Sequence, residues 1–111
     1  MVASERYIAK KPRGIGFEGA ASLPYSGSIA WDAVVNKAGL SRHNARGKRI
    51  LVHCGSCPVG CIIIQLVRLW GAHVTVTCPE RARFVCETLG SDDVIVFEEG
   101  PVDTQLSTRE K

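Results

Sequence analysis

The sequence lacks any long hydrophobic run or low-complexity tract, and only 6% of its residues are aromatic. No segment therefore has the roughly twenty apolar residues that a membrane-spanning helix needs. The formal net charge is only +3, from 14 basic and 11 acidic residues spread along the chain, which is too mild to indicate a nucleic-acid-binding surface. The 45% hydrophobic and 23% charged residues are typical of a globular protein, and 111 residues allow one hydrophobic core.

The five cysteines are not arranged as a disulfide framework, because three of them, Cys54, Cys57 and Cys61, lie within one eight-residue stretch. Such clustering favours a reducing compartment, such as the cytosol or the mitochondrial matrix. Three thiolates around one turn are also a candidate zinc or iron–sulfur site, although a closed zinc site needs a fourth ligand. We favour buried structural thiols for Cys54 and Cys61. We expect Cys57 to be the reactive thiol, because a helix N-terminus stabilises its thiolate.

The stretch from residue 47 to residue 65 organises the chain. An apolar run passes through a turn of small residues into a second apolar run of helical length, which predicts a strand, a tight loop and a helix. The free N–H groups and the positive dipole end of such a helix favour an anion. The loop is therefore a candidate nucleotide site.

The rest of the chain alternates between strand and helix patterns. We predict a short terminal strand at 7–9, helices at 17–22 and 26–38, strands at 49–53, 73–77 and 93–97, and helices at 59–70, 79–89 and from 105 onward. Right-handed crossovers make the last three strands parallel, in the order 3-2-1. Their carboxyl ends, at Cys54, Cys78 and Phe97, then share one edge. The expected fold class is α/β, a partial Rossmann sheet of about three strands preceded by a linker strand and helix.

Seven short motifs occur in the order and spacing of a known family. They are Tyr7-Ile8-Ala9-Lys10-Lys11-Pro12, Ala20-Ala21-Ser22-Leu23-Pro24-Tyr25, Ala30-Trp31, Gly47-Lys48-Arg49-Ile50-Leu51-Val52, Val59-Gly60, Ala72-His73-Val74-Thr75 and Leu89-Gly90-Ser91-Asp92-Asp93-Val94-Ile95. On these residues the chain resembles the zinc-independent quinone-oxidoreductase branch of the medium-chain dehydrogenase/reductase superfamily. It covers the middle of the family pattern.

This resemblance implies an NADPH-dependent quinone or enone oxidoreductase that works by hydride transfer without a catalytic metal. Residues 1–46 would be the end of the substrate domain with its connecting helix, and residues 47–111 the first half of the NAD(P)-binding Rossmann domain. The implied partner is a small-molecule quinone or enone, with no nucleic acid and no membrane span, and the family allows a homo-oligomer. The implied location is mitochondrial, with the cytoplasm as the alternative.

The cofactor-binding residues that the resemblance implies lie in the loop and after the second strand. They are Ser56, Cys57, Pro58, Val59, Gly60, Cys78, Arg81 and Arg83. The strand ends in Thr77 and Cys78 without a ribose-binding acid, and Arg81 or Arg83 is placed to reach a 2′-phosphate, so NADPH is expected over NADH. The alternative is that both arginines are ordinary exposed helix residues. The resemblance marks no catalytic residue in this chain.

The chain also departs from the family. Cys54, Cys57 and Pro58 stand where the family has glycine. Cys57 and Pro58 remove left-handed backbone freedom, and Pro58 also removes one N–H that would face a phosphate. Ile29 replaces a threonine near the nicotinamide. We therefore expect the chain alone, as a truncated form, to be inactive. The alternative is a non-catalytic remnant that binds a partner through uncovered sheet edges.

Overall fold

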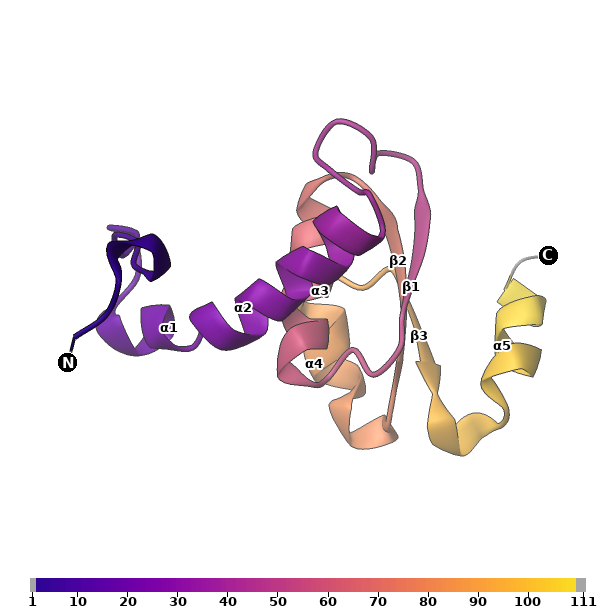
Figure 1. Cartoon of the computed structure of the whole chain (residues 1–111). Helices are drawn as coiled ribbons and strands as arrows, with labels where there is room; N and C mark the ends of the chain where they lie inside the picture. Colours follow the sequence, from indigo (N-terminus) through magenta and orange to yellow (C-terminus); the bar gives the residue numbers. More distant parts are fainter. Residues whose placement is uncertain (1, 110–111) are drawn as a thin grey trace.

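The computed structural model describes residues 2–109 and contains a three-stranded parallel sheet (Figure 1). Its strands are β1 (Arg49–Val52), β2 (His73–Cys78) and β3 (Asp93–Val96), in the order β1-β2-β3. Arg49 is aligned with His73, and Thr75 with Asp93. The predicted α/β class, the parallel strands and their order are confirmed.

Two helices connect the strands and cover one face of the sheet (Figure 1). They are α3 (Pro58–Leu69) and α4 (Arg83–Thr88). Pro58 is the first residue of α3, where its fixed φ suits the helix and its missing N–H breaks no helical bond. Helix α3 ends before Gly71, whose φ of +89° turns the chain back toward β2. Helix α5 (Val102–Arg109) contacts β3 from the other side.

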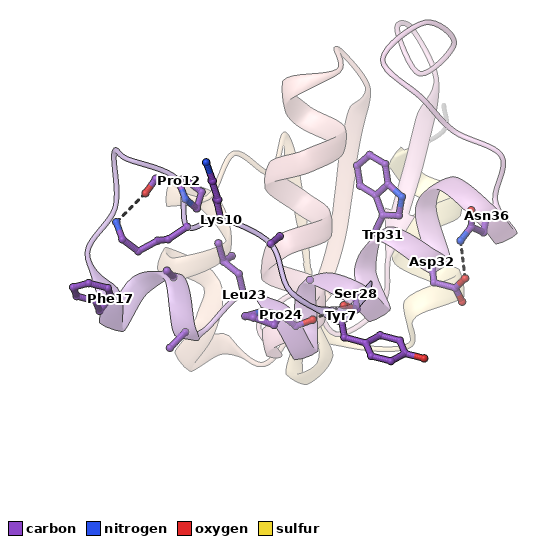
Figure 2. A pocket seen from close by; sticks show the side chains of 15 residues that line it. Tyr7, Lys10, Pro12, Phe17, Leu23, Pro24, Ser28, Trp31, Asp32 and Asn36 are labelled. Atoms are coloured by element: carbon purple, nitrogen blue, oxygen red, sulfur yellow. Dashed lines mark hydrogen bonds between the residues drawn. The ribbon is translucent and has the colours of Figure 1, made fainter. Parts of the chain in front are cut away.

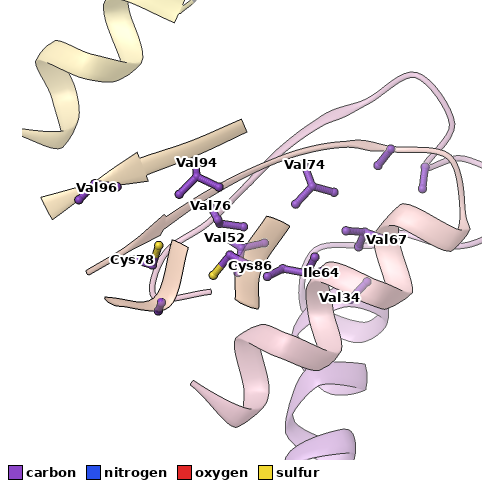
Figure 3. Close-up of a cluster of buried hydrophobic side chains, with 13 residues drawn as sticks. Val34, Val52, Ile64, Val67, Val74, Val76, Cys78, Cys86, Val94 and Val96 are labelled. Atoms are coloured by element: carbon purple, nitrogen blue, oxygen red, sulfur yellow. The ribbon is translucent and has the colours of Figure 1, made fainter. Parts of the chain in front are cut away.

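The core lies between the sheet and α3 and α4 (Figure 3). Alternate residues of each strand point into it, and Ile64 and Val67 of α3 are completely buried against them. The strand side chains of this core are Val52, Val74, Val76, Cys78, Val94 and Val96. Burying a valine or isoleucine side chain contributes about 1.5–3 kcal/mol, so the strand–helix–strand unit is the stable part of the chain.

The predicted helix at 26–38 is present, but it begins earlier and changes its winding. Helix α2 (Pro24–Trp31) continues as a π-helical segment, Asp32–Lys37, in which the Ala38 N–H donates to the Ala33 carbonyl at 2.9 Å. Ala30 is buried where α2 packs on α3. The rings of Trp31 and Trp70 meet edge to face, with centroids 6.0 Å apart.

The terminal strand predicted at 7–9 is wrong. Glu5–Tyr7 forms a 3₁₀ turn, Ile8 and Ala9 lie in irregular chain, and all five residues are exposed. No strand of the described residues lies beside this segment, so its backbone groups would have no ladder partner. The segment and the short helix α1 (Phe17–Ala21) form an arm that projects away from the sheet (Figure 1).

Two further element boundaries differ from prediction. Pro79 caps a 3₁₀ turn, Glu80–Ala82, instead of beginning a helix, and α4 follows that turn. Helix α5 begins at Val102, before the predicted start at 105, and residues 110–111 of that prediction lie outside the described residues. Within residues 2–109, no helix combines the length and the hydrophobicity needed to cross a membrane.

Candidate functional site

Thr77, at the end of β2, holds the turn between β1 and α3. Its hydroxyl oxygen accepts a hydrogen bond from the Cys54 N–H at 2.9 Å, and its carbonyl oxygen accepts one from the Gly55 N–H at 2.9 Å. The same hydroxyl lies 2.9 Å from Nδ1 of His53. Thr77 is completely buried. The turn is therefore fixed on the carboxyl edge of the sheet, where α/β folds bind ligands.

The two remaining glycines of the turn are required by close packing. A Cβ atom on Gly60 would lie 2.4 Å from the Cys54 carbonyl oxygen. One on Gly55 would lie 2.9 Å from Cβ of Val76. Gly60 thus lets the first turn of α3 lie against the loop, and Gly55 lets the loop pass over β2. These are the close approaches that a Rossmann turn needs.

Cysteine occupies a left-handed backbone position in this turn. Cys54 has φ +61°, a conformation that side chains rarely adopt and that glycine adopts freely. Cys57 has φ −76° and ψ 160°, which is ordinary extended backbone. The loss of left-handed freedom that was expected at Cys57 therefore has no effect there, because the Cys54 position uses that conformation instead. The expectation of a buried Cys54 thiol is also wrong, because Cys54 is exposed.

The N-terminus of α3 is not capped by any side chain. Its first helical hydrogen bond runs from the Cys61 N–H to the Cys57 carbonyl at 2.9 Å. The N–H groups of Val59 and Gly60 precede that bond and have no acceptor among the described residues, as is usual for the first turn of a helix. Two aligned donors and the helix dipole fit a bound phosphate. Ser56 lies half-buried beside them.

Cys78, the last residue of β2, points into the core beside Cys86 (Figure 3). Both side chains are completely buried. Burial raises the pKa of the Cys78 thiol, and burial together with the neighbouring Cys78 raises that of Cys86 to about 12. Both thiols are therefore neutral at physiological pH. At Cys78 only the backbone is left to contact a ligand at this edge.

The two arginines after β2 differ in their surroundings. Arg83 forms ion pairs with Glu80 at 3.3 Å and with Glu99 at 2.6 Å. Arg81 is exposed and has no partner among the described residues. A carboxylate is also present here, because Oε2 of Glu98 accepts a hydrogen bond from the Glu80 N–H at 2.7 Å. Arg81 is therefore the arginine that remains available for a phosphate.

A groove away from the strand edge was not expected from the sequence. It has a volume of about 1160 Å³ and lies between residues 7–12 and helices α1 and α2 (Figure 2). Tyr7, Phe17, Leu23 and Trp31 supply much of its apolar lining. Sequence reasoning missed it because the arm was predicted as a strand. Ile29, on α2, is two-fifths exposed and does not line it.

The structure gives no support to a metal site at the cysteines. Among the described residues, no three histidine, cysteine, aspartate or glutamate side chains are grouped so that they could hold one ion. Cys61 instead donates its thiol hydrogen to the Gly55 carbonyl at 3.5 Å. Burial and the nearby Cys57 raise the pKa of Cys61, which disfavours a thiolate ligand there.

Curated proteins match the chain over nearly its whole length. The mitochondrial NAD(P)H oxidoreductase RTN4IP1 of Danio rerio is 44% identical over 111 residues, covering 100% of this chain and 29% of its own length. The chloroplast envelope quinone oxidoreductase homolog of Arabidopsis thaliana is 39% identical and covers 87% of this chain and 30% of its own length. No protein-family model matches the chain.

Solved structures agree with these relatives. The quinone oxidoreductase of Coxiella burnetii superposes with a TM-score of 0.73 at 31% identity, over 89% of this chain and 29% of that one. The chain is a homologue of the quinone-oxidoreductase branch of the medium-chain dehydrogenase/reductase superfamily. A mycobacterial homologue solved in complex with NADPH is 28% identical, with a TM-score of 0.68, over 79% of this chain and 26% of that one.

The chain spans less than a third of the length of these oxidoreductases. Within that span it keeps the parallel sheet, the βα turn and the close glycine approaches of a Rossmann unit.

Proposed function

We propose that this chain is the dinucleotide-holding part of an NADPH-dependent quinone or enone oxidoreductase. The observation that carries the proposal is the uncapped N-terminus of α3. There the Val59 and Gly60 N–H groups have no acceptor among the described residues, and the turn packs directly against Gly60. The names of the relatives support a nicotinamide cofactor and a quinone substrate in the family. On this view residues 47–111 form the cofactor-binding half, and residues 1–46 lead into it from the substrate domain.

Each part of the site has a separate task. The N–H groups of Val59 and Gly60, with Ser56 beside them, would bind the pyrophosphate. The backbone at Cys78 would border the adenosine ribose, and Arg81 would pair with the 2′-phosphate. Bound NADPH would supply the hydride that a quinone or enone accepts. The residues of this chain bind and orient the dinucleotide.

Two substitutions weaken the site relative to the family. Pro58 lacks one of the N–H groups that would face the pyrophosphate, and a missing charge-assisted hydrogen bond costs about 1.5–3 kcal/mol, roughly ten- to a hundredfold in affinity. Ile29 offers no hydroxyl to the nicotinamide side. We therefore propose that this chain alone binds NADPH weakly and does not reduce quinones.

A calorimetric titration of the chain with NADPH tests this proposal. Pro58→Glu places a carboxylate at the first residue of α3, where it stabilises the helix but repels a phosphate. Pro24→Glu makes the same change at the first residue of α2 and is the matched control. NADPH affinity should fall at least about tenfold in the first variant and stay unchanged in the second. Equal effects of the two, or no binding to the unaltered chain, would refute the proposal.

Partner binding is a second candidate, favoured by the exposed aromatic residues of the arm and α2. Tyr7, Phe17 and Tyr25 are each more than four-fifths exposed, and Trp31 is half-exposed. So much exposed apolar surface is typical of a docking face. Sedimentation of the chain, compared with Phe17→Ser, tests self-association through this face. A concentration-independent monomer would count against it.

We also propose a mitochondrial location. The animal relatives named RTN4IP1 are described as mitochondrial, whereas the plant relatives belong to the chloroplast. Fractionation of cells that produce the full-length protein tests the assignment.

A further inference from the structure

We propose that Cys54 and Cys57 form a reversible disulfide across the β1–α3 turn. Both cysteines are exposed and lie at the two ends of one tight turn that Thr77 holds in place. The pair has the Cys-x-x-Cys spacing, which is a redox motif when it stands at the start of a helix after a strand.

The turn brings the two cysteines within bonding reach. The Cys57 N–H donates to the Cys54 carbonyl at 3.3 Å, which closes a four-residue turn. The Cα atoms at the ends of such a turn are less than about 7 Å apart, close to the 4.4–6.8 Å range of disulfides. The Cys57 sulfur also points back across the turn, 3.0 Å from the Cys54 carbonyl oxygen. Closing the disulfide needs rotation of the two side chains, while the Cys54 N–H keeps its hydrogen bond to the Thr77 hydroxyl.

The other three thiols are poorer partners. Cys61 lies in the first turn of α3 and is half-buried, whereas Cys54 and Cys57 are exposed. Its thiol is also directed at the Gly55 carbonyl. Cys78 and Cys86 are completely buried in the core. Geometry and access therefore both select the pair Cys54 and Cys57.

The reaction needs a low-molecular-weight disulfide, such as oxidised glutathione, as the electron acceptor. The Cys57 thiolate attacks one glutathione sulfur, which breaks the glutathione disulfide and releases one glutathione thiolate. Cys54 then loses its proton, and its thiolate attacks the Cys57 sulfur and releases the second glutathione. The protein loses two electrons and two protons, and the acceptor becomes two glutathione thiols. Excess reduced glutathione reverses both steps.

Thiol mapping of the folded chain in glutathione buffers tests the inference. The chain is equilibrated with oxidised glutathione, quenched with acid, alkylated and digested. We expect one disulfide, joining Cys54 to Cys57, with the mass loss of two hydrogen atoms and full reversal by dithiothreitol. Cys61→Ser should form the same bond. Cys54→Ser should stop at a mixed disulfide between Cys57 and glutathione.

A comparison with the unfolded chain keeps the test specific to the structure. In urea the ratio of disulfide to dithiol at the same glutathione ratio should fall at least about tenfold, because the turn no longer raises the effective concentration of the thiols. A bond between Cys57 and Cys61, a persistent mixed disulfide in the unaltered chain, or an equal ratio in urea would overturn the inference. None of these readouts needs a nucleotide, so failure here is distinct from failure of the proposed cofactor site.

Discussion

The hydroxyl of Thr77 accepts a hydrogen bond from the Cys54 N–H at 2.9 Å and thereby ties the βα turn to the neighbouring strand. This bond joins two residues that are 23 positions apart in the sequence. It makes the position of the turn depend on β2 instead of on α3 alone. The geometry at the start of α3 therefore follows from the packing of the sheet.

Thr77→Val should destabilise the chain by about 1–3 kcal/mol, because the Cys54 N–H loses its acceptor in a part-buried hydrogen bond. Thr75→Val is the matched control: it lies on the same strand and the same face, and its hydroxyl makes no hydrogen bond with the described residues. Urea unfolding monitored by circular dichroism measures both. Equal stability of the two variants would show that the hydroxyl does not hold the turn.

Cys54→Gly should stabilise the chain by up to about 1.5 kcal/mol. Relief of the left-handed conformation at φ +61° is worth about 1–2 kcal/mol, and the greater freedom of glycine in the unfolded chain offsets about 0.4–1 kcal/mol. Cys57→Gly, at φ −76°, has no strain to relieve and should be neutral or destabilising. Thermal unfolding checks the pair, and a loss of stability in Cys54→Gly would show that the backbone there is relaxed.

The Asp92 carboxylate links the residue before β3 to β2 and makes the free energy of unfolding depend on pH in the acid range. Burial alone raises the pKa of Asp92, but the Val74 N–H at 2.8 Å, the Arg68 guanidinium and the nearby His73 outweigh it and hold the pKa below its ordinary value. A depressed pKa gives stability that is present above the unfolded pKa of about 3.9 and is lost as pH falls through the folded value.

Asp92→Asn should therefore lower the free energy of unfolding at neutral pH by about 1–3 kcal/mol, since it removes hydrogen bonds to a charged group. The difference from the unaltered chain should shrink as pH falls below 4. Urea unfolding at a series of pH values measures this. A difference that stays constant down to pH 2 would assign the effect to packing instead of charge.

Arg81 and Glu98 should have opposite effects on the choice between NADPH and NADH. Arg81→Ala should weaken NADPH binding about tenfold and leave NADH unchanged, because only NADPH carries the 2′-phosphate. Glu98→Gln removes a negative charge beside the Glu80 N–H and should favour NADPH. Arg83→Ala is the comparison, since Arg83 is already paired with two carboxylates. Calorimetric titrations with NADPH and NADH measure these affinities. A larger loss of NADPH affinity in Arg83→Ala than in Arg81→Ala would contradict the assignment of the 2′-phosphate to Arg81.

The fold was readable from the sequence where a pattern depends on near neighbours. The runs that became β1, β2 and β3 are rich in valine and isoleucine, and the crossover rule then sets their order. The segment at 7–9 has a similar composition, yet it forms no strand, because β structure needs a partner that composition does not reveal. The prediction of an anion site at the N-terminus of α3 likewise rested on one local strand–turn–helix pattern.

The rest of the site depends on contacts between distant residues. Nothing in the sequence marks Thr77 as the acceptor for Cys54, since a threonine in a strand is ordinary. The left-handed backbone of Cys54 was missed because cysteine rarely adopts it. The carboxylate of Glu98 reaches the end of β2 from the 3₁₀ turn that follows β3, and the ion pair between Arg83 and Glu99 joins the same two segments.

The most direct test of the central claim, that the N-terminus of α3 holds a dinucleotide phosphate, is a titration of the ¹⁵N-labelled chain with NADPH followed by backbone amide NMR. We expect the largest shifts at the amides of Val59 and Gly60, with a smaller group at Cys78 and Arg81, and both groups should need a higher NADPH concentration in Pro58→Glu. Largest shifts around Leu23 and Trp31 in the apolar groove, or no shifts at α3, would contradict it.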